Sequence, residues 1–152
     1  MKVLISSCIM GNNVRWNGAN KLDKNISTWA ADNNIELVPI CPEAELFGTP
    51  RKSIRLLYAD NNIQAVMGEK DVMPRLDNKC SDLLERHADA VGFVGIAGSP
   101  TCGISVGVKF GGFVTKGSFH KLANIPTTEI SAMKTDSNRK LFLRRLRKHA
   151  DR

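Results

Sequence analysis

The chain has 152 residues, of which 42% are hydrophobic, and a formal net charge of +7. This length is enough for one well-buried core and short for two, so we expect a single compact domain. No run approaches the ~18 apolar residues of a membrane span, and the apolar run after Met1 is too short for a signal peptide. These features predict a cytoplasmic protein without a membrane partner.

The positive charge is concentrated at the carboxyl end of the chain. Residues 134–152 contain eight Lys or Arg and two Asp, whereas residues 1–133 contain fourteen basic and thirteen acidic residues. We therefore divide the chain into a nearly neutral domain at residues 1–133 and a basic C-terminal helix at residues 134–152. This helix is expected to pack on the domain or to extend from it.

Three strand-like segments each lead into a cysteine. Residues 2–7 run into Cys8, residues 36–40 run into Cys41, and residues 90–97 lead to Cys102. If the three strands lie parallel in one sheet, their carboxyl ends bring these cysteines to one edge. The sequence therefore predicts an α/β fold with a mostly parallel, Rossmann-like sheet flanked by helices, with cysteine-bearing loops at the carboxyl ends of the strands.

Hydrophobic periodicity and turn residues predict the remaining elements. In chain order they are a helix at 21–33, a long loop at 41–51, a hairpin at 53–67, a helix capped by Asp71 and ending near His87, a Gly-rich loop or short hairpin near the site at 103–117, a strand at 125–130 and a helix at 138–150. Residues 14–18, between the first strand and the first helix, are Val-Arg-Trp-Asn-Gly. Arg15 and Trp16 can hold a planar polar ring, or they can belong to an ordinary surface turn.

The four cysteines differ in their setting. Cys80 lies on the apolar face of the helix that follows Asp71, where it is interpreted as a small buried hydrophobe. Cys8, Cys41 and Cys102 are 33 and 61 residues apart, which excludes a local Cys-x-x-Cys motif. Three thiolates without a close fourth ligand suit an iron–sulfur cluster with one open iron. A zinc site and plain burial are also compatible with this spacing.

Three motifs around these cysteines make a more specific pattern. Residues 6–11 are Ser-Ser-Cys-Ile-Met-Gly, residues 41–43 are Cys-Pro-Glu followed by Gly48 and Pro50-Arg51, and residues 99–103 are Ser-Pro-Thr-Cys-Gly. In order and separation they resemble the thiouracil desulfidase family, over about residues 1–130. The chain departs from the usual family pattern at residues 52–55, Lys-Ser-Ile-Arg, and at residues 95–98, Gly-Ile-Ala-Gly, where family members usually carry a lysine.

The resemblance implies a 4Fe-4S cluster that is held by Cys8, Cys41 and Cys102 and has one iron without a protein ligand. It implies removal of sulfur from the thiocarbonyl of a thiolated pyrimidine, such as 2-thiouracil or 4-thiouracil, and its replacement by oxygen without net redox change. The catalytic roles of the family carry over to Glu43 and Ser99. A soft sulfur suits an open iron, and a carboxylate can activate the attacking water.

Substrate contacts are expected from Ser7, beside the first cysteine, and from Arg15 and Trp16. The expected substrate is a small thiolated base, and thiolated tRNA is a second possibility through the basic C-terminal helix. Two other functions remain open at this stage. One is a non-catalytic zinc or thiol-metal binding module, and the other is a basic RNA-binding protein whose thiols play no part.

Overall fold

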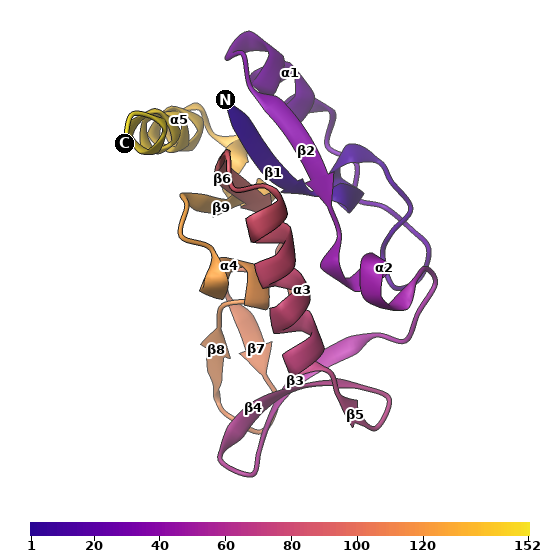
Figure 1. Ribbon diagram of the computed structural model, residues 1–152. Helices are drawn as coiled ribbons and strands as arrows, with labels where there is room; N and C mark the ends of the chain where they lie inside the picture. Colours follow the sequence, from indigo (N-terminus) through magenta and orange to yellow (C-terminus); the bar gives the residue numbers. More distant parts are fainter.

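A four-stranded parallel sheet forms the centre of the protein (Figure 1). The structure is a computed structural model that describes residues 1–152. The strands, in the spatial order β2-β1-β6-β9, are β2 (Glu36–Ile40), β1 (Lys2–Ser6), β6 (Ala90–Gly95) and β9 (Thr127–Glu129). Residues 3–5 of β1 are completely buried, because this inner strand is covered on both faces. The predicted α/β fold with a parallel sheet is confirmed.

Helices cover both faces of this sheet. Side chains of a strand alternate between the faces, so β1 sends Val3 and Ile5 to one side and Leu4 to the other. The first side carries α1 (Lys24–Asp32), the 3-10 helix η2 (Ile130–Lys134) and α5 (Asp136–Ala150). The second side carries α3 (Met73–Arg86) and α4 (Ser118–Leu122).

Two small antiparallel sheets extend from the lower end of α3 in Figure 1. One contains β3 (Ile54–Ala59), β4 (Asn62–Met67) and β5 (Lys70–Asp71), and the other contains β7 (Val106–Val108) and β8 (Phe113–Thr115). Lys109 joins them, since its amide donates to Leu56 O at 2.9 Å and its carbonyl accepts from Tyr58 N at 2.9 Å. The predicted hairpin at 53–67 is present. The Gly-rich segment is also a hairpin, but it packs on β3 and does not line the cavity described below.

The segment after the second cysteine differs from its prediction. Instead of a loop, it begins with α2 (Pro42–Phe47), because Pro42 has the backbone angle of a first helical residue and lacks the N–H that such a position leaves unpaired. Cys41 caps this helix, and its Sγ accepts a hydrogen bond from Ala44 N at 3.4 Å. The first turn also contains Glu43, whose charge is favoured at a helix amino end.

Other helices also begin at residues that differ from the predicted ones, and capping side chains explain two of these starts. The first strand ends at Ser6, one residue earlier than predicted, and the loop that was expected from Cys8 begins with the 3-10 helix η1 (Ser7–Met10). Helix α1 begins later than predicted, at Lys24, because the carboxylate of Asp23 accepts from the amides of Asn25 and Ile26. Helix α5 begins at Asp136, two residues earlier than predicted, and Thr135 caps it. No helix of the protein is both long and apolar enough to cross a bilayer.

Helix α5 shares the core of the sheet. Phe142 and Leu146 are 2% and 0% exposed, and they pack with Val3, Ile5 and Val94. Ala150, one turn further along the helix, is exposed. A Cβ at Gly92 in β6 would meet Leu146 Cδ2 directly, so the helix approaches the sheet closely only because residue 92 is glycine.

This packing predicts a large effect for a change in α5. Leu146→Ala should lower the free energy of unfolding by about 2–5 kcal/mol, the range for deleting a buried leucine side chain. Arg147→Ala, on the neighbouring exposed position, should change it by no more than about 0.5 kcal/mol. Denaturant unfolding measures both. Equal, small effects would show that α5 is not part of the folded core.

Candidate active site

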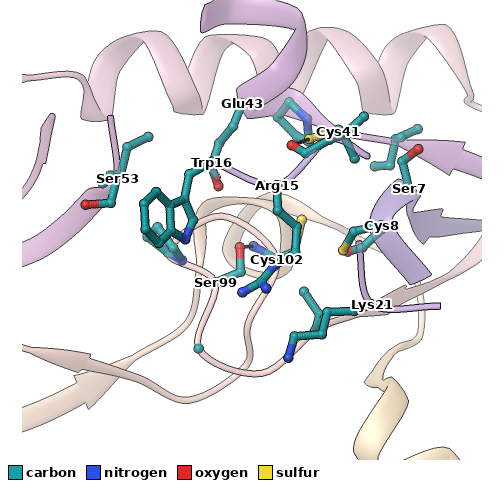
Figure 2. A pocket seen from close by; sticks show the side chains of 18 of the residues that line it. Ser7, Cys8, Arg15, Trp16, Lys21, Cys41, Glu43, Ser53, Ser99 and Cys102 are labelled. Atoms are coloured by element: carbon teal, nitrogen blue, oxygen red, sulfur yellow. Dashed lines mark hydrogen bonds between the residues drawn. The ribbon is translucent and has the colours of Figure 1, made fainter. Parts of the chain in front are cut away.

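A cavity of about 480 Å³ lies at the carboxyl ends of β1, β2 and β6. Ligands of open α/β sheets bind at this edge, because loops from neighbouring strands converge there. Eight residues proposed from the sequence line this cavity, several of them visible in Figure 2: Ser7, Cys8, Arg15, Trp16, Cys41, Glu43, Ser99 and Cys102. The structure therefore brings together candidates that are up to 95 residues apart in the chain.

Three free thiols reach the cavity from three separate segments. Cys8 lies in η1 and Cys102 in the loop after β6, and these two residues are 7% and 6% exposed. Cys41 lies between β2 and α2. Figure 2 shows the three around a common space. Cys80 is absent from this lining, since it is completely buried against Leu83 and Phe93 between α3 and the sheet.

Burial disfavours the ionised form of these thiols. It is the main cause that raises the pKa of Cys8 and Cys41, and it raises the pKa of Cys102 well above its usual value. The neighbouring Cys41 raises the pKa of Cys8 further, whereas the Ala44 N–H at the start of α2 acts on Cys41 in the opposite direction. Arg15 lowers the pKa of Cys8 and Arg51 that of Cys41, but burial outweighs both, so three thiolates would need further positive charge, which a metal can supply.

The thiols do not form a tight single-ion site. No group of three His, Cys, Asp or Glu side chains lies close enough together to hold one metal ion. In an iron–sulfur cluster each thiolate binds a different iron, so the thiolates lie further apart than those around one ion. The observed donor set, three free thiols around a roomy cavity, fits such a cluster.

A buried carboxylate faces the same cavity. Glu43 is 9% exposed, and its Oε2 accepts a hydrogen bond from Thr101 Oγ1 at 2.9 Å. Its Oε1 lies 3.5 Å from Arg51 Nη2. The Arg51 side chain is only 6% exposed and also donates to Val14 O at 2.7 Å. The charge of Glu43 is therefore paired and hydrogen-bonded, as a buried carboxylate requires.

Ser99 organises the loop that carries Cys102. Its Oγ accepts hydrogen bonds from Cys102 N at 2.9 Å and from Thr101 N at 3.3 Å. This is the turn-forming role that serine often has, and it leaves the hydroxyl proton free to donate. Ser7 Oγ accepts from Asn12 Nδ2 at 2.8 Å, which holds the loop after η1.

Arg15 and Trp16 contribute the open side of the cavity. The turn that carries them is joined to the segment after α2, since Arg51 N donates to Trp16 O at 2.8 Å. Trp16 is 47% exposed, and Figure 2 shows its indole on the side of the cavity where Glu43 and Ser53 lie. Arg15 and Trp16 therefore belong to a turn at the surface, and both also line the cavity.

Several residues of the site carried no assignment from the sequence. Arg51 and Thr101 were visible only as parts of the motifs around Cys41 and Cys102. Lys21 lines the cavity, although the sequence suggested the start of a helix there. With Arg15, Lys21 and Arg51 against Glu43, the cavity has three cations and one carboxylate, which favours an electron-rich or anionic ligand.

Comparison with known proteins agrees with this site. A family model described as 2-thiouracil desulfurase matches residues 3–139 and includes all three cysteine motifs. The chain belongs to the 2-thiouracil desulfurase family. The resemblance of its three cysteine motifs to this family is therefore confirmed.

A solved structure shows the same fold. The protein named 4Fe-4S-dependent thiouracil desulfidase TudS is 21% identical, with a TM-score of 0.69 over 87% of this chain and 92% of that one. No curated protein matches the sequence significantly.

Two segments that were expected to depart from the family pattern reach the cavity wall. Five residues of the segments 52–55 and 95–98 line the cavity: Ser53, Ile54, Ile96, Ala97 and Gly98. If these departures are real, they lie in the wall of the cavity that also contains the three thiols.

Cys8, Cys41 and Cys102 line the cavity, whereas Cys80 does not. Cys8→Ser, Cys41→Ser and Cys102→Ser should each abolish retention of iron and sulfide after anaerobic reconstitution, because each removes one cavity thiol. Cys80→Ser is the matched control and should retain both. Iron analysis and visible absorption measure the outcome. Iron loss from Cys80→Ser with full retention in Cys8→Ser would contradict the assignment.

Proposed function

We propose that this protein is a 4Fe-4S-dependent desulfidase, which replaces the sulfur of a thiolated pyrimidine or a related thio-compound with oxygen. The observation that carries the proposal is the meeting of three free thiols and a buried carboxylate in one cavity of a 2-thiouracil desulfurase family member. Cys8, Cys41 and Cys102 would hold the cluster, and one iron would have no protein ligand. The net reaction adds water to the thiocarbonyl carbon and releases sulfide.

Cys8, Cys41 and Cys102 would hold the cluster at the cavity, where it would supply a Lewis-acidic, sulfur-binding iron for a thiocarbonyl. A zinc-binding module is less well supported, because the three thiols do not lie close enough together to bind one metal ion. A function in RNA binding alone would leave the converging thiols and Glu43 without a role.

Glu43 is the proposed general base. Its Oε2 is held by the Thr101 hydroxyl, whereas the distance of Oε1 to Arg51 Nη2 is long for a hydrogen bond. Oε1 is therefore the oxygen that remains available to take a proton from water. Thr101 and Arg51 fix the direction of the carboxylate, and positioning of this kind is what efficient proton transfer requires.

Ser99, Ser7, Arg15 and Trp16 are the proposed partners of the substrate. The acceptor capacity of Ser99 Oγ is used by two backbone amides, so its proton is free to stabilise negative charge that develops on the substrate ring. The half-exposed indole of Trp16 offers a flat surface on which a pyrimidine can stack. Arg15 contributes a planar cation at the same opening, and Ser7 lies beside Cys8.

Replacement of the proposed base tests the mechanism. Glu43→Gln should lower kcat on a thiolated pyrimidine by about 10²-fold or more, because the amide keeps the size of the side chain but cannot accept the proton. Iron content should stay at the wild-type level. Glu45→Gln, on the exposed side of α2, is the control and should keep full activity. A fully active Glu43→Gln enzyme would transfer the role of base to another group.

The position of the basic helix α5 helps to distinguish a free thiolated base from a thiolated tRNA as the substrate. Its exposed cations Arg144, Arg145, Arg147 and Lys148 lie in the second half of α5. Arg145 donates to Thr127 O at the start of β9, and Figure 1 shows the end of α5 on the side where β1 begins. The thiols lie at the opposite, carboxyl edge of the sheet. This placement favours a free thiolated base over a thiolated tRNA held by α5.

A joint replacement of these four cations by Gln separates the two substrates. We expect unchanged activity on a free thiolated base, since the cations do not line the cavity. Activity should be measured at several salt concentrations on both the base and a thiolated tRNA. A loss confined to tRNA, with a flatter salt dependence, would contradict the small-molecule proposal and make α5 an RNA-binding surface.

A further inference from the structure

The start of α4 lies against the loop that carries Cys102. We call residues 117–120 the α4 clamp. Three of its backbone amides donate to carbonyls of that loop: Gly117 N to Gly103 O (2.8 Å), Ser118 N to Pro100 O (3.3 Å) and Phe119 N to Thr101 O (2.9 Å). The fourth residue, His120, reaches the remaining carbonyl with its side chain, and Nε2 lies 2.7 Å from Cys102 O. Four consecutive carbonyls are therefore held by four consecutive residues.

The contact of His120 defines its tautomer. A carbonyl oxygen only accepts hydrogen bonds, so Nε2 must carry the proton. The other ring nitrogen, Nδ1, is buried and has no hydrogen-bond partner. The residue is 4% exposed, and its ring centroid lies 4.9 Å from that of Phe93. A buried nitrogen without a partner costs free energy, which a purely apolar side chain at this position would avoid.

Glycines permit this close approach. A Cβ at Gly95, the last residue of β6, would lie 2.5 Å from His120 Nε2 and would collide with Cys102 O. A Cβ at Gly117 would lie 2.7 Å from Thr101 O. Real Cβ contacts of this kind do not occur, so β6, the cysteine loop and the α4 clamp fit together only without these side chains.

Cys102 O is also the acceptor of Ile96 N at 3.1 Å. With His120 as the second donor, both lone pairs of this carbonyl are used, and the peptide plane next to Cys102 cannot rotate freely. Fixing that plane restrains the backbone at Cys102, from which the side chain projects. A side chain from a different element, α4, thus restrains the backbone of a residue that lines the cavity.

We propose that His120 is a positioning residue for the iron–sulfur cluster, which acts by fixing the backbone of the ligand Cys102. The inference rests on the proposed function, in which Cys102 is a ligand. Replacing a residue that orients a metal ligand typically lowers the metal affinity by about 10–100-fold. His120 has no contact with the cavity itself, so this role is separate from those of Glu43 and Ser99.

Three variants distinguish positioning from packing. His120→Leu removes the N–H donor, and His120→Gln keeps a donor at similar reach. Phe119→Leu is the matched packing control, because Phe119 is completely buried against Phe93 and its backbone amide remains in place. After anaerobic reconstitution, iron release to a chelator should be about 10–100-fold faster in His120→Leu. His120→Gln and Phe119→Leu should release iron close to the wild-type rate.

A second measurement requires no cluster. In the cluster-free protein, iodoacetamide should modify Cys102 faster in His120→Leu than in the wild type, whereas Cys80 should react at an unchanged rate. Peptide mass spectrometry gives both rates in one sample, and Cys80 reports global unfolding because it is 0% exposed.

The outcomes separate this inference from the proposed function. A wild-type protein that takes up no cluster would overturn the proposed function, and the ratio of the Cys102 and Cys80 rates would still decide whether His120 holds the loop. An unchanged ratio in His120→Leu, or iron release that rises equally in Phe119→Leu and is not restored in His120→Gln, would overturn the inference.

Discussion

The site depends on one constraint: the neighbouring parallel strands β1, β2 and β6 end at the same edge of the sheet. Ser6 is paired with Ile40, and Ile5 with Val94, so the three strands stop at nearly the same level. Because the strands are parallel, their following loops leave from one edge and enclose one cavity. Cys8 and Cys41 follow their strands within two residues, so their positions are almost fixed by the sheet. Cys102 lies seven residues beyond β6 and needs additional support.

That support comes from polar contacts between loops. The Thr101–Glu43 hydrogen bond joins the Cys102 loop to α2, and Arg51 joins α2 to the turn that contains Trp16. A buried carboxylate is costly unless it is paired, so these contacts compensate for the burial of Glu43 while they hold the loops together. The same residues thus set the shape of the cavity and the direction of its acidic group. The α4 clamp provides the backbone part of this support.

The distribution of charge has two separate consequences. Within the cavity, cations exceed carboxylates, in keeping with a site for an electron-rich ligand. In the C-terminal helix, the cations face outward while Phe142 and Leu146 complete the core beneath β1 and β6. The basic segment that stood apart by composition is therefore an integral layer of the fold, and its charge lies away from the cavity.

The sequence by itself determined the buried strands and the core position of Cys80, because hydrophobic runs and periodicity depend on local pattern. It predicted the convergence of the three cysteines only on the condition that their strands are parallel in one sheet, which the structure shows. It also indicated the family, through motifs that are short and contiguous. The α2 helix was missed because Pro42 and the thiol cap of Cys41 outweigh the loop-like composition of residues 41–51. Only the tertiary structure decided the partners of Glu43, the place of Lys21 in the cavity and the contact of His120 with Cys102. Each of these contacts joins segments that are far apart in the chain. Local sequence patterns do not show which distant segments come into contact, so the contacts became visible only in the folded structure.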